Sequence, residues 1–229
     1  MRIREDEASP FRKCTAMCLD AGQLESPLPP VALASRSPRR RELLAAHGVR
    51  HQIVDAGVDD GELIPGNQDP RSWVMALAYL KAQAAASHMD RSACAEEQLI
   101  LAADTICVMD GKIIGQPVDE EDARRILELF RDAEHEVLTG VALLNTRTGQ
   151  RDLFVDVARV RVGHITDEQI DTYLASGQWR GKAGAYNLSE RLEAGWPITF
   201  EGDPTSIMGL PMGVLTTRLA RFARSAACD

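Results

Sequence analysis

The stretch VALASRSPRRRELLAAHG, residues 31–48, decides the fold class because it joins a short apolar strand to a helix. Its apolar part, 31–35, has the length of a buried strand. Ser37 and Pro38 follow, a favoured helix N-cap and a favoured first helical residue. We therefore predict a helix over 38–47 that ends at Gly48. A strand that leads directly into a helix is typical of an α/β protein.

The same alternation continues along the chain. Asp69-Pro70 predicts a second helix that extends to about His88. Its expected apolar face carries Trp73, Leu77, Leu80 and Ala84. The run QLILAAD at 98–104 is typical of a buried strand, and TICVMDGKII continues it as a hairpin that turns at Asp110-Gly111.

The second half of the chain adds an antiparallel pair and three helices. EVLTGVALL and DLFVDVARVRV flank the turn NTRTGQ, which predicts two paired strands. Asp119 caps one helix, and Thr166 with Gln169 forms a capping box for another that ends at Gly177. A last helix begins near Pro211. The pattern predicts an α/β fold with a mixed sheet.

Composition excludes several classes of protein. The chain has 229 residues, of which 26 are Lys or Arg and 34 are Asp or Glu, so its net charge is −8. An acidic surface repels phosphate polymers, so we expect neither a nucleic-acid partner nor a membrane surface.

Residues 1–30 are polar and aperiodic, which indicates an N-terminal extension. We expect residues 31–229 to form a single domain.

The cysteines and the apolar runs indicate a cytoplasmic protein. The cysteines are scattered and odd in number, which favours reduced thiols over a disulfide framework; they are Cys14, Cys18, Cys94, Cys107 and Cys228. The first residues contain no run like the core of a signal peptide. No stretch approaches the roughly 20 apolar residues of a membrane helix.

Three arginines stand at the wrong end of a helix. Arg39, Arg40 and Arg41 fall in the first turn, where the positive end of the helix dipole disfavours each cation by roughly 0.3–1 kcal/mol. A bound phosphate would remove this conflict, because helix N–H groups and guanidinium forks both donate to its oxygens. Successive helical residues point 100° apart, so two of the three should reach one ligand. The alternative is a solvated basic turn paired with Glu42.

Other candidate residues are ambiguous from local pattern. Asp104 ends an apolar run, which is typical of a strand-end turn, although a carboxylate there could bind a cation or accept a proton. Lys81, alone on an alanine-rich helix, has the pattern of a surface residue. The segment GKAGAYNLS at 181–189 could bring backbone amides and Lys182 to a ligand. His135 is expected at the start of a strand.

Six segments together resemble the Maf family of nucleoside triphosphate pyrophosphatases. They stand in the order and spacing of that family over about residues 31–222: LASRSPRRRELL, LAYLKA, ADTICVMDGKIIGQP, HEVLTGVALL, GKAGAY and MGLPM. The resemblance implies an elongated, two-lobed Maf/ITPase-like α/β fold with a mixed β-sheet and a central cleft. It also implies hydrolysis of a nucleoside triphosphate to the monophosphate and pyrophosphate, with Mg²⁺ or Mn²⁺ as cofactor and a possible homodimer.

The resemblance assigns roles to individual residues. Asp104 would accept the proton of the attacking water and bind the metal, for which Asp59 and Asp60 are further candidates. The substrate-binding residues would be Ser35, Arg39, Arg40, Lys81, Thr105, Gln116, Lys182 and Ser189. Of these, Arg39, Thr105 and Ser189 would set the base preference. The family's older naming suggests an alternative, a nucleotide-binding regulator of cell division or septum formation that acts through partners with little turnover.

Two departures from the family pattern bear on the substrate. Gln116 stands where the family usually has a lysine, and Ser189 stands where the branch acting on dTTP and UTP has a glutamine. The branch acting on 7-methyl-GTP tends to carry an acid at that place, and Glu190 is one residue away. A serine cannot make the contacts of an amide, so the sequence leaves the preferred base open.

The missing lysine gives the first testable prediction. Glutamine donates a hydrogen bond but carries no charge, so triphosphate binding should be weaker than with lysine. We expect Gln116→Lys to lower KM for the triphosphate substrate in a steady-state assay of pyrophosphate release. An unchanged KM would contradict this role for position 116.

Overall fold

The computed structural model describes residues 28–58, 63, 65–88 and 99–226. Its elements in chain order are β1 (Val31–Leu33), α2 (Pro38–Ala46), β2 (His51–Ile53), α3 (Pro70–His88), β3 (Leu99–Met109), β4 (Lys112–Ile114), α4 (Glu120–Phe130), β5 (Ala133–Asn145), β6 (Arg151–Val162), α5 (Asp167–Ala175), the 3₁₀ turn η1 (Ala183–Ala185), α6 (Leu188–Glu193), β7 (Ile198–Glu201), α7 (Pro204–Ile207) and α8 (Met212–Ala226). The predicted α/β fold with a mixed sheet is confirmed.

One mixed sheet runs the length of the molecule in the order β2-β1-β3-β5-β6-β7, with β4 added to the edge of β3. β1 is parallel to both β2 and β3, and every other pairing is antiparallel. β1 ends at Leu33, which pairs with Leu101, whereas β3 continues to Met109 and meets β4 only from Cys107. Among the residues that the structure describes, no strand pairs with the edge of β3 between these two pairings.

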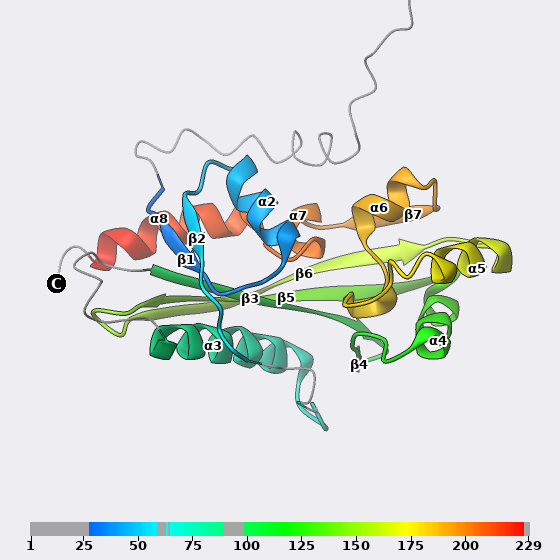
Figure 1. The fold of residues 1–229 in the computed structure, drawn as a ribbon, viewed down its shortest axis with the longest axis horizontal. Helices are drawn as coiled ribbons and strands as arrows, with labels where there is room; N and C mark the ends of the chain where they lie inside the picture. The colour runs from blue at the N-terminus through cyan, green and yellow to red at the C-terminus, as the bar shows by residue number, and fades with distance from the viewer. Residues whose placement is uncertain (1–27, 59–62, 64, 89–98, 227–229) are drawn as a thin grey trace, which may run out of the picture.

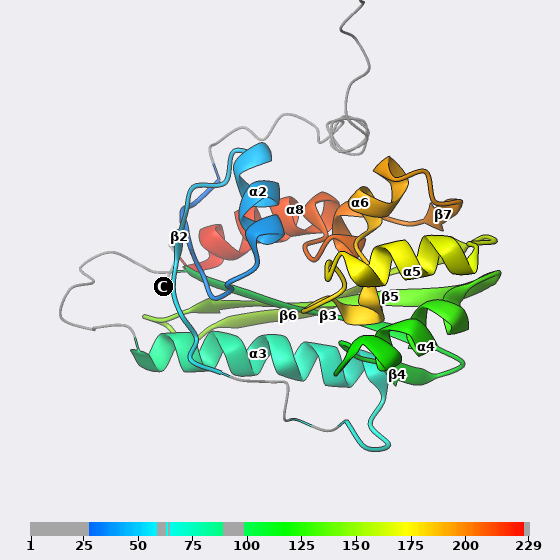
Figure 2. The same cartoon turned by 45° about the vertical axis from the view of Figure 1, so that its right-hand side comes forward.

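Helices cover both faces of the sheet and divide it into two lobes. α3 lies along one face, and α2, α7 and α8 lie on the other (Figure 1). A buried cluster joins α2 and α8 to one end of the sheet, and a second joins α4, α5 and α6 to the other end. Figure 2 shows α5 and α6 on the same side of the sheet as α2 and α8. The molecule is elongated because these two clusters lie side by side along the strands.

Most predicted elements are confirmed, and the errors have a common cause. The 110–111 turn has positive φ at both residues, 51° and 73°, as a two-residue hairpin requires. The capping box of Thr166 and Gln169 is present. β2, α6, β7 and α7 were not predicted, because elements of three to six residues are too short to show a periodic apolar pattern.

Two smaller expectations need correction. Leu28 is buried in the α2 and α8 cluster, so the core includes residues before position 31. Leu80 is 43% exposed, and the buried face of α3 is instead a narrow stripe of Val74, Leu77, Ala78, Ala82 and Ala85. The small alanine side chains allow the helix to lie close to the sheet. Trp73 and Leu80, which were predicted on this face, are too large for such a close contact. Among the described residues, no helix is both long and apolar enough to span a membrane.

α3 packs tightly against the sheet at Gly140, which pairs with Asp104 across β3 and β5. A Cβ atom at this glycine would lie 2.5 Å from the carbonyl oxygen of Val74. A side chain there would push α3 away from the strand that carries Asp104.

We predict that Gly140→Ala destabilises the protein by about 1–3 kcal/mol, because the added methyl group overlaps backbone atoms that cannot move independently. Urea denaturation measures the loss. Gly115→Ala is the matched control, since a Cβ there meets nothing within 4 Å and the residue has no positive φ. Equal stability of the two variants would contradict the tight packing.

Candidate active site

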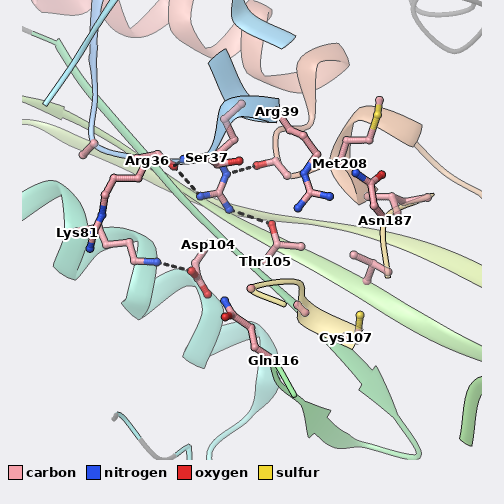
Figure 3. Close-up of a pocket in the computed structure, with 18 of the residues that line it drawn as sticks. Arg36, Ser37, Arg39, Lys81, Asp104, Thr105, Cys107, Gln116, Asn187 and Met208 are labelled. Atoms are coloured by element: carbon pink, nitrogen blue, oxygen red, sulfur yellow. Dashed lines mark hydrogen bonds and ion pairs between the residues drawn. The ribbon is translucent and has the colours of Figure 1, made fainter. Parts of the chain in front are cut away.

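A cavity of about 300 Å³ opens at the bare edge of β3. One wall is the segment from Ala34 to Arg40, where β1 ends and α2 begins. The floor includes Asp104 and Thr105 on β3, and Gln116 and Asn187 line other parts of the cavity (Figure 3). The pocket lies between the two lobes, where the predicted central cleft was expected.

The topology of the sheet explains the position of this pocket. The chain leaves β1 through α2 to reach β2 on one side, then returns through α3 to β3 on the other side. The carboxyl end of β1 is thus a point at which the connections diverge, and ligands of open α/β sheets bind at such points. Because β1 has only three residues, the crevice reaches the middle of β3.

Asp104 and Lys81 form an ion pair in the pocket. The Lys81 Nζ donates to Asp104 Oδ1 over 2.6 Å, and the two side chains are 15% and 12% exposed (Figure 3). The interpretation of Lys81 as a surface residue is wrong, because Lys81 lies one turn after the buried Leu77 and faces the sheet. Asp104 does not end a strand either; it is the sixth of eleven residues of β3, and it faces the pocket that begins where β1 ends.

The Arg40 guanidinium is held by three acceptors. Its Nε donates to the carbonyl oxygen of Gly209 over 2.9 Å, and its terminal nitrogens donate to Ser35 Oγ and Thr105 Oγ1 over 3.1 and 3.2 Å. These partners come from three separate elements of the chain. The side chain is therefore fixed before any ligand binds.

Arg39 differs from Arg40, because no hydrogen bond or ion pair holds its side chain among the described residues. Its guanidinium extends into the pocket (Figure 3). Burial lowers its pKa, and the nearby Glu190 carboxylate partly opposes this shift. Arg41 does not line the pocket, so the helix start directs two of its three arginines to the cavity, as the helical spacing predicted.

Sequence reasoning missed two charged residues at the mouth of the pocket. Arg36 lines it from the β1–α2 connection, and Asp55 lines it from the residues after β2. The Arg36 Nε and Asp55 Oδ1 lie 3.9 Å apart, and both side chains are largely exposed. Recognition of β2 as a parallel strand would have drawn attention to Asp55, because it follows the carboxyl end of that strand.

Lys182 and Ser189 are not among the residues that line the cavity. The Lys182 Nζ donates to the Glu190 carboxylate, and Asn187 Nδ2 donates to the same carboxylate over 2.8 Å. Burial lowers the pKa of Lys182, and Glu190 opposes the shift. The Ser189 N–H and O–H both donate to Asn187 Oδ1 at the start of α6. Asn187, which was not predicted, is the polar residue of this segment that faces the pocket. The binding roles of Lys182 and Ser189 stay predictions.

The pocket offers oxygen ligands suited to a divalent cation. Asp55 and Asp104 both line it, and Mg²⁺ commonly binds one or two carboxylates together with substrate phosphates. Asp59 and Asp60 lie outside the described residues. Within the described part of the chain, no group of three or more His, Cys, Asp or Glu side chains is arranged to hold a metal ion by itself. The presence of Asp55 and Asp104 in one pocket fits a metal whose other ligands come from a phosphate substrate.

Aromatic residues support the far wall of the pocket. Tyr186 lines the cavity, and its hydroxyl is 2.9 Å from Nε2 of His135. His135, near the start of β5 as predicted, stacks on Phe130 with ring centroids 3.8 Å apart. It is 2% exposed, and this burial lowers its pKa to about 4. The imidazole is therefore neutral at pH 7. Cys107, the free cysteine of the described residues, is buried beside this wall.

Comparison with known proteins places the chain among a set of related sequences. A family model described as Maf-like protein matches residues 30–222. A protein from Halalkalibacterium halodurans is 40% identical over 183 residues, which are 80% of this chain and 90% of that protein. A protein from Pelotomaculum thermopropionicum is 36% identical over 84% of this chain and 96% of its own length. One from Ralstonia nicotianae is 37% identical over 86% and 96%. Each of the three is named dTTP/UTP pyrophosphatase.

The buried His135 should make the stability of the protein depend on pH. Its pKa falls from 6.5 in the unfolded chain to about 4, so the unfolded state binds a proton that the native state does not. The free energy of unfolding is therefore unaffected by this group above pH 6.5 and falls as the pH drops toward 4, in total by on the order of 3 kcal/mol. We expect wild type to lose about this much more stability than His135→Gln in urea titrations between pH 7 and 4. Parallel losses in the two proteins would contradict the assignment.

Proposed function

The chain belongs to the Maf family, and from this membership and its site we propose that it is a nucleoside triphosphate pyrophosphatase. It hydrolyses its substrate to the monophosphate and pyrophosphate. One observation carries the proposal: the buried Asp104 carboxylate lies in the same pocket as Arg36, Arg39, Arg40 and Lys81. A carboxylate surrounded by cations suits the hydrolysis of an anionic substrate.

The cations bind the triphosphate. Guanidinium groups form paired hydrogen bonds with phosphate oxygens, and the N-terminus of α2 adds backbone N–H groups. Arg40 is already oriented for this purpose, and Arg39 has its guanidinium in the cavity. Their charge also stabilises the negative charge that moves to the departing pyrophosphate. The protein as a whole is acidic, so this attraction is confined to the pocket.

Asp104 is the proton acceptor for the attacking water. Its carboxylate is held by a central strand and by the hydrogen bond from Lys81, so it needs no rearrangement before the reaction. The water attacks the α-phosphorus, its proton passes to the carboxylate, and the bond from the α-phosphorus to the bridging oxygen of pyrophosphate breaks. Fixed catalytic groups of this kind lower the entropic cost of the transition state.

Asp55 and Asp104 are the described residues that would hold Mg²⁺ or Mn²⁺, and Asp59 and Asp60 are further candidates. When bound, such an ion would neutralise phosphate charge and favour deprotonation of water. The remaining groups act without it: the arginines bind phosphate and Asp104 accepts the proton.

The first substrates to test are dTTP and UTP, because the related proteins carry those names. Asn187 and Tyr186 line the same pocket as Arg39 and are the described candidates for contact with the nucleoside. A panel that adds the other nucleoside triphosphates and 7-methyl-GTP, each with Mg²⁺ or Mn²⁺, identifies the preferred base and metal. A protein that binds nucleotides but releases no pyrophosphate would instead be a nucleotide-binding regulator.

We predict that Asp104→Asn lowers kcat for pyrophosphate release by about 10²–10⁴-fold, the usual contribution of a general base. The amide keeps the shape of the side chain but cannot accept the proton at neutral pH. The matched control is Asp152→Asn, which removes a carboxylate bonded to Arg218 outside the pocket and should leave kcat unchanged. If Asp104→Asn retained wild-type kcat, the proposed role of Asp104 would be wrong.

A further inference from the structure

Behind Arg40 lies a closed ring of hydrogen bonds. The Arg40 terminal nitrogen donates to Thr105 Oγ1, and Thr105 Oγ1 lies 2.9 Å from Thr139 Oγ1. Thr139 in turn donates to the carbonyl oxygen of Ser206 over 2.8 Å. The ring closes through the backbone, because the Gly209 N–H also donates to Ser206 and the Gly209 carbonyl accepts from Arg40 Nε.

The direction of each hydrogen bond in the ring is determined. A hydroxyl group has one proton. Thr139 uses its proton for the Ser206 carbonyl, so the bond between the two threonines must be donated by Thr105. Thr105 then accepts from Arg40 with its oxygen lone pair. Each hydroxyl accepts one bond and donates one.

Thr139 takes part in this ring without access to the ligand. It is 0% exposed, lies opposite Thr105 in the register of β3 and β5, and does not line the cavity. Side chains directly opposite on antiparallel strands are close enough for their hydroxyls to bond. Any effect of Thr139 on a ligand in the pocket must therefore pass through its two bonded neighbours, Thr105 and the Ser206 carbonyl, and both of these lead to Arg40.

We propose that Thr139 is a positioning residue for substrate phosphate, acting through Thr105 to set the plane of the Arg40 guanidinium. Two in-plane N–H groups match two phosphate oxygens only when this plane is fixed. The inference rests on the proposed function, because it gives Arg40 the triphosphate as its ligand. It adds a residue outside the pocket to the determinants of substrate affinity.

Removal of the Thr139 hydroxyl has a local consequence. Without it, the Thr105 hydroxyl loses the acceptor for its proton. The hydroxyl can then rotate and turn its proton toward the Arg40 N–H, which weakens the hydrogen bond that Thr105 accepts from Arg40. The Ser206 carbonyl still accepts a hydrogen bond from the Gly209 N–H, so it is not left without a donor. The expected damage is thus a less ordered Arg40.

The test compares Thr139→Val, which keeps the shape of threonine, with Thr139→Ser, which keeps the hydroxyl. For the preferred triphosphate, we expect Thr139→Val to raise KM about tenfold while kcat changes by less than about threefold. Thr139→Ser should restore KM to near the wild-type value. A fall in kcat with unchanged KM, or no rescue by serine, would overturn the proposal.

A second measurement separates positioning from loss of stability. Binding of the triphosphate is measured by calorimetry in wild type, Thr139→Val, Arg40→Lys and the double variant. Lysine cannot form the planar fork, so Thr139→Val should weaken binding about tenfold in wild type and have no further effect with Lys at position 40. Additive effects of the two changes would show that Thr139 does not act through Arg40. Calorimetry does not require turnover, so failure of the proposed activity and failure of this inference are distinguishable.

Discussion

The early end of β1 is the constraint on which the rest of the site depends. β1 pairs with β3 over three residues only, and β4 returns to β3 six residues later, at Cys107. In the interval, β3 presents an uncovered edge, although its two faces are packed against helices. Such an edge normally invites pairing by another strand. Here the start of α2 and the segment around Gly209 lie over this edge and leave a cavity beside it. The interruption of strand pairing therefore provides the space for the candidate site.

The alternation of side chains along β3 then distributes the chemistry between two layers. Asp104 points to the α3 face, where Lys81 meets it, and Thr105 points to the opposite face, where Arg40 meets it. The dipeptide Asp104-Thr105 therefore connects the ion pair with Lys81 on one face of the sheet to the Arg40 guanidinium on the other face. The close contact of α3 at Gly140 and the ring through Thr139 hold these two layers in place from opposite sides.

Features that depend on neighbouring residues in the chain, such as helix starts and turns, were predicted from the sequence. Features that depend on how strands pair in the sheet were predicted less well. The helix start at Pro38, the turn at Asp110 and the capping box at Thr166 depend on neighbours in the chain and were predicted. β2 is a three-residue edge strand with mostly exposed side chains, so no pattern marked it and Asp55 was missed. Asp104 ends an apolar run in the sequence but lies inside β3, and the pocket that it faces depends on the end of β1, which lies in another segment. The contact of Thr139 with Thr105 follows from strand register, which no local pattern reveals.

Three charged residues that line the pocket stand against local rules, and among the described residues two of them have a bonded partner. Arg40 opposes the dipole of its helix but is held by a carbonyl and two hydroxyls. Lys81 is largely buried on an apolar helix but is paired with Asp104. Arg39 has no such partner among the described residues, and burial lowers its pKa. An arginine kept half-buried without a bonded anion costs the folded protein free energy that a bound phosphate would return. The imbalance at Arg39 is therefore the physical reason that this pocket, in an acidic protein, should attract a triphosphate.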